Sequence, residues 1–204
     1  MDLNLNIAAI VNSTQAEGPG RRFTLWVQGC PLTCPNCCNP ELLSFKPQRW
    51  RSVDDIFKLI AVQKAIEGVT FLGGEPFSQA SALAALANKV RAHNLSVMVF
   101  TGYTKKFIDK EQNQDWNALL AQTDLLIDGP YVEKLHTSQR HWIGSSNQKV
   151  HFLTDRYQYL QAQKNSWDSG KNSIELRLSG NTMTLNGFPD AKVDQWLNTL
   201  KNKS

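Results

Sequence analysis

All four cysteines of this chain lie within nine positions, in the stretch QGCPLTCPNCCN. Thiols grouped in this way can form a disulfide, bind zinc or hold an iron–sulfur cluster, and these alternatives lead to very different proteins. Cysteines only two or three residues apart close very small loops, which add little stability as crosslinks. The grouping therefore favours a metal site over a disulfide. The cysteines are Cys30, Cys34, Cys37 and Cys38.

The rest of the sequence indicates one main globular domain. Hydrophobic residues make up 41% of the 204 residues and charged residues 20%, a composition typical of folded chains. The N-terminal segment MDLNLNIAAIVNST lacks the features of a signal peptide, and no apolar run approaches the roughly 20 residues of a membrane span. We therefore expect a cytoplasmic protein with no membrane partner, in a compartment where structural disulfides are rare.

The charge distribution argues against a nucleic-acid partner. The formal net charge is only +4, and the basic residues are scattered along the chain. The pairs Arg21–Arg22 and Lys105–Lys106 are the exceptions, and neither forms a basic stripe. Isolated basic pairs are usually solvated surface, so no nucleic-acid binding is expected.

The spacing of the cysteines distinguishes zinc from iron–sulfur chemistry. Structural zinc sites usually take their ligands from two pairs that are well separated in sequence. This chain has no second cysteine pair, and its four histidines are remote from the cluster. Three cysteines spaced C-x3-C-x2-C can instead hold an iron–sulfur cluster and leave one iron open. Cys30, Cys34 and Cys37 fit that spacing, and Cys38 is left as an extra thiol lining the site.

Strands and helices alternate through the first three quarters of the chain. Short apolar or β-branched runs predict strands, and stretches with helical periodicity lie between them. The first of these helical stretches is expected to begin after Ser52, a capping residue, and to end at Gly68. This alternation predicts parallel βα units in an open sheet or a barrel. Strands are expected at 23–28, 69–72, 96–100, 125–128 and 149–153, and the later helices at 78–93, 105–110 and 115–122.

Unusual loops follow four of these predicted strands. They are the cysteine cluster, Gly73–Pro76 (GGEP), Thr101–Tyr103 (TGY) and Asp128–Tyr131 (DGPY). The C-terminal ends of parallel strands meet on one face of an α/β fold, where active sites are built. We therefore expect the four loops to converge on a single cavity.

The end of the chain has a different pattern. The segment SIELRLSGNTMTLNGF alternates apolar and polar residues around a turn at 179–181, which predicts a β-hairpin. Pro189 and Asp190 are expected to open a last helix with apolar residues at 193, 196, 197 and 200. The expected organisation is a core domain at 1–160 with a hairpin-and-helix appendage at 161–204 packed on it.

The motifs together resemble a known family. Cys30-x3-Cys34-x2-Cys37 followed by GGEP is similar to the radical S-adenosylmethionine superfamily. The segments EGPGR (17–21), WVQGC (26–30), DGPY and GSSNQ (144–148) resemble the small activating proteins of anaerobic ribonucleotide reductases, over about 12–153. The resemblance implies a partial (β/α) barrel, a [4Fe–4S] cluster and S-adenosylmethionine (SAM). It further implies reductive cleavage of SAM to a 5′-deoxyadenosyl radical that abstracts hydrogen from a substrate.

The resemblance also assigns roles to individual residues. Cys30, Cys34 and Cys37 are the expected cluster ligands and the catalytic cysteines. An ordinary surface, turn or polar-loop role remains the alternative for Arg21, Asp128, Tyr131 and Asn147. The residues expected to contact the cofactors are Gly73, Gly74, Glu75, Pro76, Asn39 and Thr101. The candidate substrate contacts are Arg21, Cys38, Asp128, Tyr131 and Asn147.

Two positions in the cysteine loop depart from the family pattern. Many superfamily members have an aromatic residue just before the third cysteine, whereas reductase activators commonly have glycine there and an aromatic residue just after it. This chain has Asn36 and Cys38 at those two positions. The aromatic residue that normally lies near the adenine of the cofactor is therefore replaced, and substrate choice could differ with it.

Three functions remain open on the sequence. The first is activation of a glycyl-radical enzyme, by hydrogen abstraction from a glycine Cα of a partner protein, with flavodoxin or ferredoxin as electron donor. The second is modification of a ribosomally made precursor peptide by rearrangement, crosslinking or excision, with a small peptide-recognition subunit. The third is a non-catalytic cysteine-cluster protein, which GGEP disfavours because a structural site needs no cofactor-binding loop.

Overall fold

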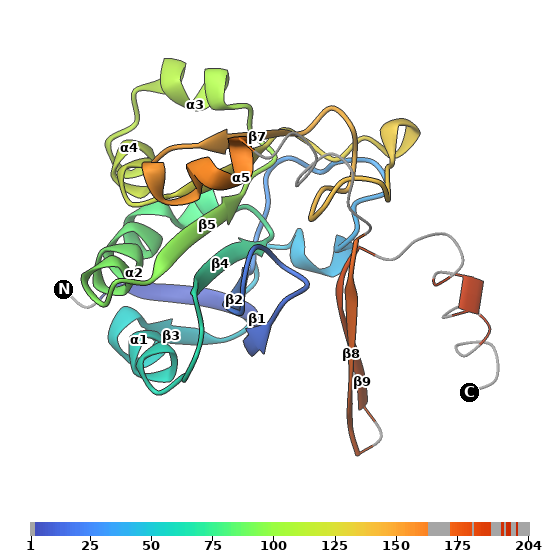
Figure 1. The fold of residues 1–204 in the computed structure, drawn as a ribbon, viewed down its shortest axis with the longest axis horizontal. Coiled ribbons are helices and arrows are strands. Elements are labelled where there is room, and N and C mark those ends of the chain that lie inside the picture. Colours follow the sequence, from blue (N-terminus) through green and yellow to red (C-terminus); the bar gives the residue numbers. More distant parts are fainter. Residues whose placement is uncertain are drawn as a thin grey trace.

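A computed structural model describes residues 3–162, 172–180 and 182–188, together with residues 193, 195, 196 and 199. Within these ranges the chain forms one large mixed sheet, helices packed against it and a separate two-stranded hairpin (Figure 1). The predicted α/β class is therefore confirmed. None of the helices in the described part is long and apolar enough to cross a membrane.

The large sheet has seven strands in the order β3-β1-β2-β4-β5-β6-β7. The four central strands β2, β4, β5 and β6 are parallel to one another. Strand β1 pairs antiparallel with both β2 and β3, and β7 pairs antiparallel with β6. The edge strands β3 and β7 do not pair with each other, so the sheet is open. The partial barrel stays a prediction. The strands are β1 (Asn4–Thr14), β2 (Arg22–Val27), β3 (Trp50–Ser52), β4 (Gly68–Gly73), β5 (Ser96–Phe100), β6 (Leu125–Asp128) and β7 (Lys149–Phe152).

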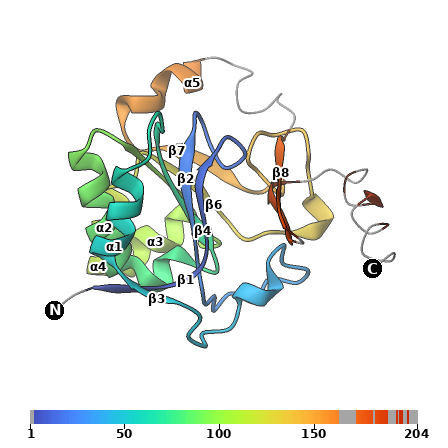
Figure 2. The same cartoon turned by 90° about the horizontal axis from the view of Figure 1, so that it is seen from below.

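Helices α1 to α4 lie together on one side of the sheet (Figures 1 and 2). Their apolar residues form the main core with the strands, and α2 buries Leu83, Leu86 and Val90 completely. The helices are α1 (Val53–Ala61), α2 (Ala80–Ala92), α3 (Lys105–Glu111), α4 (Gln114–Ala121) and α5 (Gln158–Ala162). Short 3-10 turns occur at η1 (Pro40–Leu42), η2 (Pro76–Gln79), η3 (Glu133–Leu135) and η4 (Asp155–Tyr157).

The start of α1 agrees with the sequence, but its end does not. The Ser52 hydroxyl accepts a hydrogen bond from the Asp55 amide and caps the helix as predicted. The prediction that Gly68 stops this helix is wrong, because α1 ends at Ala61 and Gly68 is the first residue of β4. A Cβ on Gly68 would lie 2.0 Å from the Ser96 hydroxyl oxygen, so this glycine allows β4 and β5 to pair closely.

The longest strand, β1, was not predicted. It pairs with β2 along most of its length and with β3 only at Asn4–Asn6. Leu5 and Ile7 are fully buried against the main core. Alternating apolar residues in LNLNI were the available signal for a strand here.

A buried arginine joins the loop before β2 to the sheet. Arg22 is fully buried, and its guanidinium donates to Thr70 Oγ1 at 2.7 Å and to the Pro19 carbonyl at 3.2 Å. It also donates to Ser96 Oγ and Tyr157 OH. Burial lowers the pKa of this guanidinium. The guanidinium thus joins Pro19 of the loop to residues of β4 and β5.

The predicted hairpin is present as β8 (Ile174–Ser179) and β9 (Thr182–Gly187). The Gly187 amide donates to Glu17 Oε1 at 2.7 Å, and the Arg177 guanidinium donates to the Ser13 carbonyl. The hairpin is therefore attached to the end of β1 and to the loop that follows it. The predicted helix after Pro189 lies mostly outside the described residues.

Candidate active site

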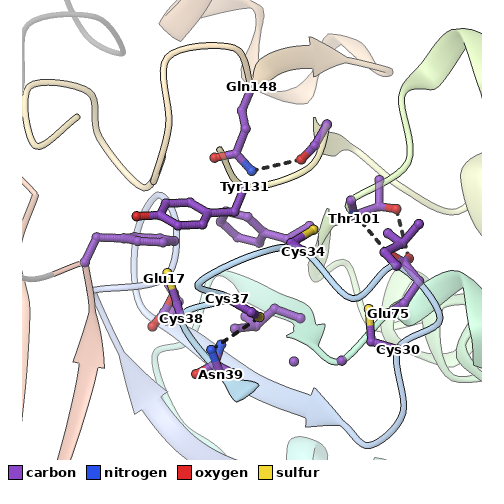
Figure 3. Close-up of a pocket in the computed structure, with 18 residues that line it drawn as sticks. Glu17, Cys30, Cys34, Cys37, Cys38, Asn39, Glu75, Thr101, Tyr131 and Gln148 are labelled. Carbon is purple, nitrogen blue, oxygen red and sulfur yellow. Dashed lines mark hydrogen bonds between the residues drawn. The ribbon is translucent and has the colours of Figure 1, made fainter. Parts of the chain in front are cut away.

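The four unusual loops meet in one cavity, as the order of the parallel strands requires (Figure 3). The cavity has a volume of about 140 Å³. It is open at the C-terminal edge of β2, β4, β5 and β6, where α/β folds place their sites. Its lining includes all four cysteines, Asn39, Gly73, Gly74, Glu75, Thr101 and Tyr131 from the prediction, and Glu17, Leu32, Leu72, Phe100, Gly102, Gly129, Gln148 and Phe188 in addition.

The cysteine loop is held at both ends by backbone hydrogen bonds. The Cys30 amide donates to the Leu43 carbonyl at 3.1 Å, and the Cys37 amide donates to the Cys34 carbonyl at 3.2 Å. The Asn39 amide lies 3.5 Å from Cys37 Sγ, and the Tyr131 amide hydrogen-bonds the Cys34 thiol. Amides aimed at sulfur stabilise the charge of cluster thiolates.

The thiols differ in exposure. Cys30, Cys34 and Cys37 are half-buried, whereas Cys38 is exposed. Burial raises the pKa of Cys30 and Cys34 above the ordinary thiol value. Binding of iron to these thiols would therefore displace protons.

The structure explains why asparagine stands before the third cysteine. Asn36 has a φ of +54°, in the left-handed region that glycine and asparagine adopt most readily. Its side chain also donates to Glu133 Oε2 at 2.6 Å, which ties the loop to η3. Asparagine, like glycine, can thus take the left-handed conformation that this turn requires.

The glycines of GGEP bring that loop against the backbone that leads into Cys30. The Gly74 amide donates to the Val27 carbonyl, and the Glu75 amide donates to the Gly29 carbonyl, both at 2.8 Å. A Cβ on Gly74 would lie 2.2 Å from the Gly29 oxygen. Only glycine fits at this position. Pro76 begins the 3-10 turn η2 and is buried behind the cavity wall.

The Glu75 side chain connects two of the loops. It is 1% exposed, and its oxygens accept from the Phe77 amide (2.9 Å), Thr101 Oγ1 (2.8 Å) and the Gly102 amide (2.9 Å). Burial raises the pKa of its carboxyl to about 7, against the lowering effect of these bonds. Glu75 therefore positions the TGY loop beside GGEP and keeps a carboxyl group in the cavity wall.

Sequence reasoning did not select Glu17, the first residue of EGPGR. It lines the cavity, is 4% exposed, and accepts a hydrogen bond from the Gly187 amide of the hairpin. Burial raises the pKa of this carboxyl to about 7 as well. Its place at the start of EGPGR, one of the segments that carry the family resemblance, was the available signal.

Two of the five candidate substrate residues, Cys38 and Tyr131, line the cavity. Arg21 is exposed and precedes β2, at the opposite end of that strand from the cysteines. Its neighbour Arg22 is the buried arginine instead. A pair of adjacent arginines in the sequence does not indicate which one points inward.

Asp128 and Asn147 serve the loops that surround the cavity. The Asp128 carboxylate accepts from the Lys105 amide at 2.6 Å and lies 3.0 Å from His151 Nε2. The Asn147 side-chain amide donates to the Pro130 carbonyl at 2.8 Å. Gln148, the next residue, lines the cavity and donates to the Gly129 carbonyl (Figure 3).

The donor types that line the cavity are those that an iron–sulfur cluster takes. In the described ranges, no three cysteine, histidine or acidic side chains lie close enough together to hold one metal ion. A [4Fe–4S] cluster needs a wider set, because each thiolate binds a different iron. Three half-buried thiols line one open cavity, with Gly73 and Gly74 beside them, and thiolate is the ligand that such a cluster takes.

This chain has relatives among known proteins. A family described as a 4Fe-4S single cluster domain matches residues 16–151. The anaerobic ribonucleoside-triphosphate reductase-activating protein of Vibrio cholerae is 32% identical over 146 residues, which is 68% of this chain and 92% of the relative. The pyruvate formate-lyase-activating enzyme of Streptococcus mutans is 28% identical over 74% of this chain and 60% of that enzyme. The solved structure of QueE from Escherichia coli aligns with 51% of this chain over 54% of the QueE chain, at 22% identity and a TM-score of 0.38.

Proposed function

Because this chain belongs to the radical SAM superfamily, and within it to the family of anaerobic ribonucleoside-triphosphate reductase-activating proteins, we propose that it activates a glycyl-radical enzyme. The family is one of enzymes whose cofactors are a [4Fe–4S] cluster and SAM. The proposed reaction removes a hydrogen atom from a glycine Cα of the partner protein. The observation that carries the proposal is the meeting of the cysteine triplet and GGEP on a single cavity.

The cofactors supply the radical chemistry. When both are bound, one electron converts SAM into methionine and a 5′-deoxyadenosyl group that takes the glycine hydrogen and leaves as 5′-deoxyadenosine. The protein binds, orients and shields these groups. Cys30, Cys34 and Cys37 would hold three irons and leave the fourth for SAM.

The residues around the cysteines would shape the place where SAM binds. Glu75 fixes the TGY loop against GGEP, and the backbone groups of both loops face the cavity. Phe100, Tyr131 and Phe188 add apolar surface to the lining. An apolar enclosure keeps water and stray hydrogen donors away from a radical. These aromatic rings would take the place of the aromatic residue that Cys38 replaces.

Flavodoxin or ferredoxin is the proposed electron donor. A second candidate function keeps this chemistry and modifies a ribosomally made peptide, with a small recognition subunit as partner. The observation that favours it is the β8–β9 hairpin, which lies beyond the family match at 16–151 and beside the cavity.

Deuterium transfer tests the proposed function directly. The reconstituted, reduced protein is incubated with SAM and with the anaerobic ribonucleoside-triphosphate reductase of the same genome, labelled with deuterated glycine. We expect a glycyl radical by EPR and deuterium in 5′-deoxyadenosine. SAM cleavage without a radical or label in this reductase would reject the proposal, and label from a precursor peptide would favour the second candidate.

A further inference from the structure

A groove runs from the cysteine-lined cavity to the hairpin. It has a volume of about 950 Å³, and its opposite walls are Ala8–Val11 of β1 and Met183–Gly187 of β9. The groove and the cavity are continuous, because they share six lining residues. These are Glu17, Cys38, Asn39, Leu72, Tyr131 and Phe188.

Both walls are strands that have a partner on only one side. In the described part of the chain, β9 pairs with β8 alone, and β1 pairs with β3 only at Asn4–Asn6, so Ala8–Val11 has β2 as its strand partner. A strand of this kind has backbone groups available for an added strand. Ala8 and Ala9, which line this part of the groove, have small side chains.

The hairpin extends the groove with an apolar strip, which consists of Leu176, Leu178, Met183 and Leu185. Leu178 lies opposite Met183 in the register, and Leu176 lies opposite Leu185, so the four side chains share one face of the hairpin. Leu178 is 78% exposed, and Leu176 and Met183 are each 41% exposed. Met183 and Leu185 also line the groove.

The hairpin is bonded at its base to the cavity wall and to the end of β1. The Gly187 amide binds Glu17 in the cavity wall, and the Arg177 guanidinium binds the Ser13 carbonyl at the end of β1. The Phe188 ring lies 6.5 Å from the Phe100 ring, between their centroids. Phe188, the residue that follows β9, is thus part of the cavity lining.

From these observations we propose that the groove and the apolar strip bind an extended segment of the protein substrate. The segment adds as a strand along β9, and alternate apolar side chains of the segment contact the strip. Its target residue then reaches the cavity past Cys38 and Tyr131. The described lining contains a single arginine, Arg49, so a nucleic acid or another polyanion is not the occupant that it favours. This inference rests on the proposed function, since it names how the substrate of that site is held.

Two variants test the groove without altering the cavity. Ala9→Trp fills the groove at an exposed position, and Leu178→Glu places a charge on the strip at a position that is already exposed. Ala61→Trp and Val62→Glu are matched controls at exposed positions at the end of α1, where Val62 is 70% exposed. Neither Ala9 nor Leu178 lines the cysteine-lined cavity.

The probe is the anaerobic ribonucleoside-triphosphate reductase of the same genome, with the full-length reconstituted activator. We expect the KM for reductase to rise about tenfold or more in both test variants and in neither control, with SAM cleavage in the absence of reductase as in the wild type. A peptide spanning the target glycine should compete, and its backbone N-methylated form should compete about tenfold less well.

The outcomes separate the inference from the function on which it rests. Wild-type KM values in both test variants, with normal radical formation, would overturn the groove proposal alone. Equal competition by the methylated peptide would overturn strand addition. Failure of the wild type to form any radical in the reductase, despite SAM cleavage, would instead reject the proposed function.

Discussion

Replacing Glu17 by glutamine should stabilise the protein above neutral pH. The Glu17 carboxyl is buried, and burial raises its pKa from 4.5 to about 7. A difference of that size corresponds to roughly 3 kcal/mol that folding loses when the group ionises. A glutamine side chain at this position would stay neutral and would keep an oxygen for the Gly187 amide, which now donates to Oε1 at 2.7 Å.

The direction of this pH effect on stability follows from the number of protons that the folded and unfolded states bind. Because the folded-state pKa lies above the unfolded value, the folded protein binds more protons between pH 4.5 and 7. The stability associated with Glu17 is therefore complete below pH 4.5 and is lost as the pH rises through 7. Glu75, whose pKa is also raised to about 7 by burial, adds a second loss over the same range.

Urea unfolding of the apo-protein under reducing, anaerobic conditions measures this effect. Wild type and Glu17→Gln should have similar free energies of unfolding at pH 4.5, and the variant should be more stable by up to roughly 3 kcal/mol at pH 8. Glu17→Ala is the matched control, because it removes the charge and also the acceptor for the hairpin. A variant that is less stable than wild type at pH 8 would refute the reasoning, since it would mean that the ionised carboxylate has stabilising partners.

Three further substitutions follow from buried or strained positions. Arg22→Met should lower the free energy of unfolding by roughly 3 kcal/mol or more in urea titrations, because it leaves buried acceptors such as Thr70 and Ser96 without their donor. A loss of stability smaller than that of Tyr157→Phe would contradict this structural role of Arg22. Asn36→Ala should lower the free energy of unfolding by roughly 1–2 kcal/mol, because residue 36 has a left-handed backbone conformation, and it should lower the iron content after reconstitution. Asn36→Gly should do neither, and equal iron content in the two variants would show that the turn is unimportant. Phe188→Ala should weaken SAM binding about tenfold in equilibrium dialysis, and unchanged binding would remove the hairpin from the cofactor site.

The arrangement of the active site was predictable because it depends on order along the chain. Strands at β2, β4, β5 and β6 could be recognised from short apolar runs, and the loops after them carry the unusual residues. Parallel neighbours necessarily place those loops at one edge. The cavity confirms that the cysteine loop, GGEP, TGY and DGPY converge.

What could not be predicted depends on side-chain direction and on contacts distant in sequence. Arg22 rather than Arg21 is buried, and Gln148 rather than Asn147 lines the cavity. Adjacent residues cannot be distinguished without the register. Glu17 and Phe188 enter the site because the hairpin meets the loop after β1 about 170 residues earlier, and no local pattern reports such a contact. The strand β1 was missed although its first residues alternate.

The cysteine assignment is the central claim, and iron analysis tests it most directly. Each cysteine is replaced singly by alanine, and the reconstituted proteins are measured for iron and for 5′-deoxyadenosine formed from SAM with a reductant. We predict about four irons per chain in the wild type and in Cys38→Ala, with SAM cleavage retained. Cys30→Ala, Cys34→Ala and Cys37→Ala should lose the intact cluster and the cleavage. Retained cleavage in any of these three, or its loss together with the cluster in Cys38→Ala, would contradict the account.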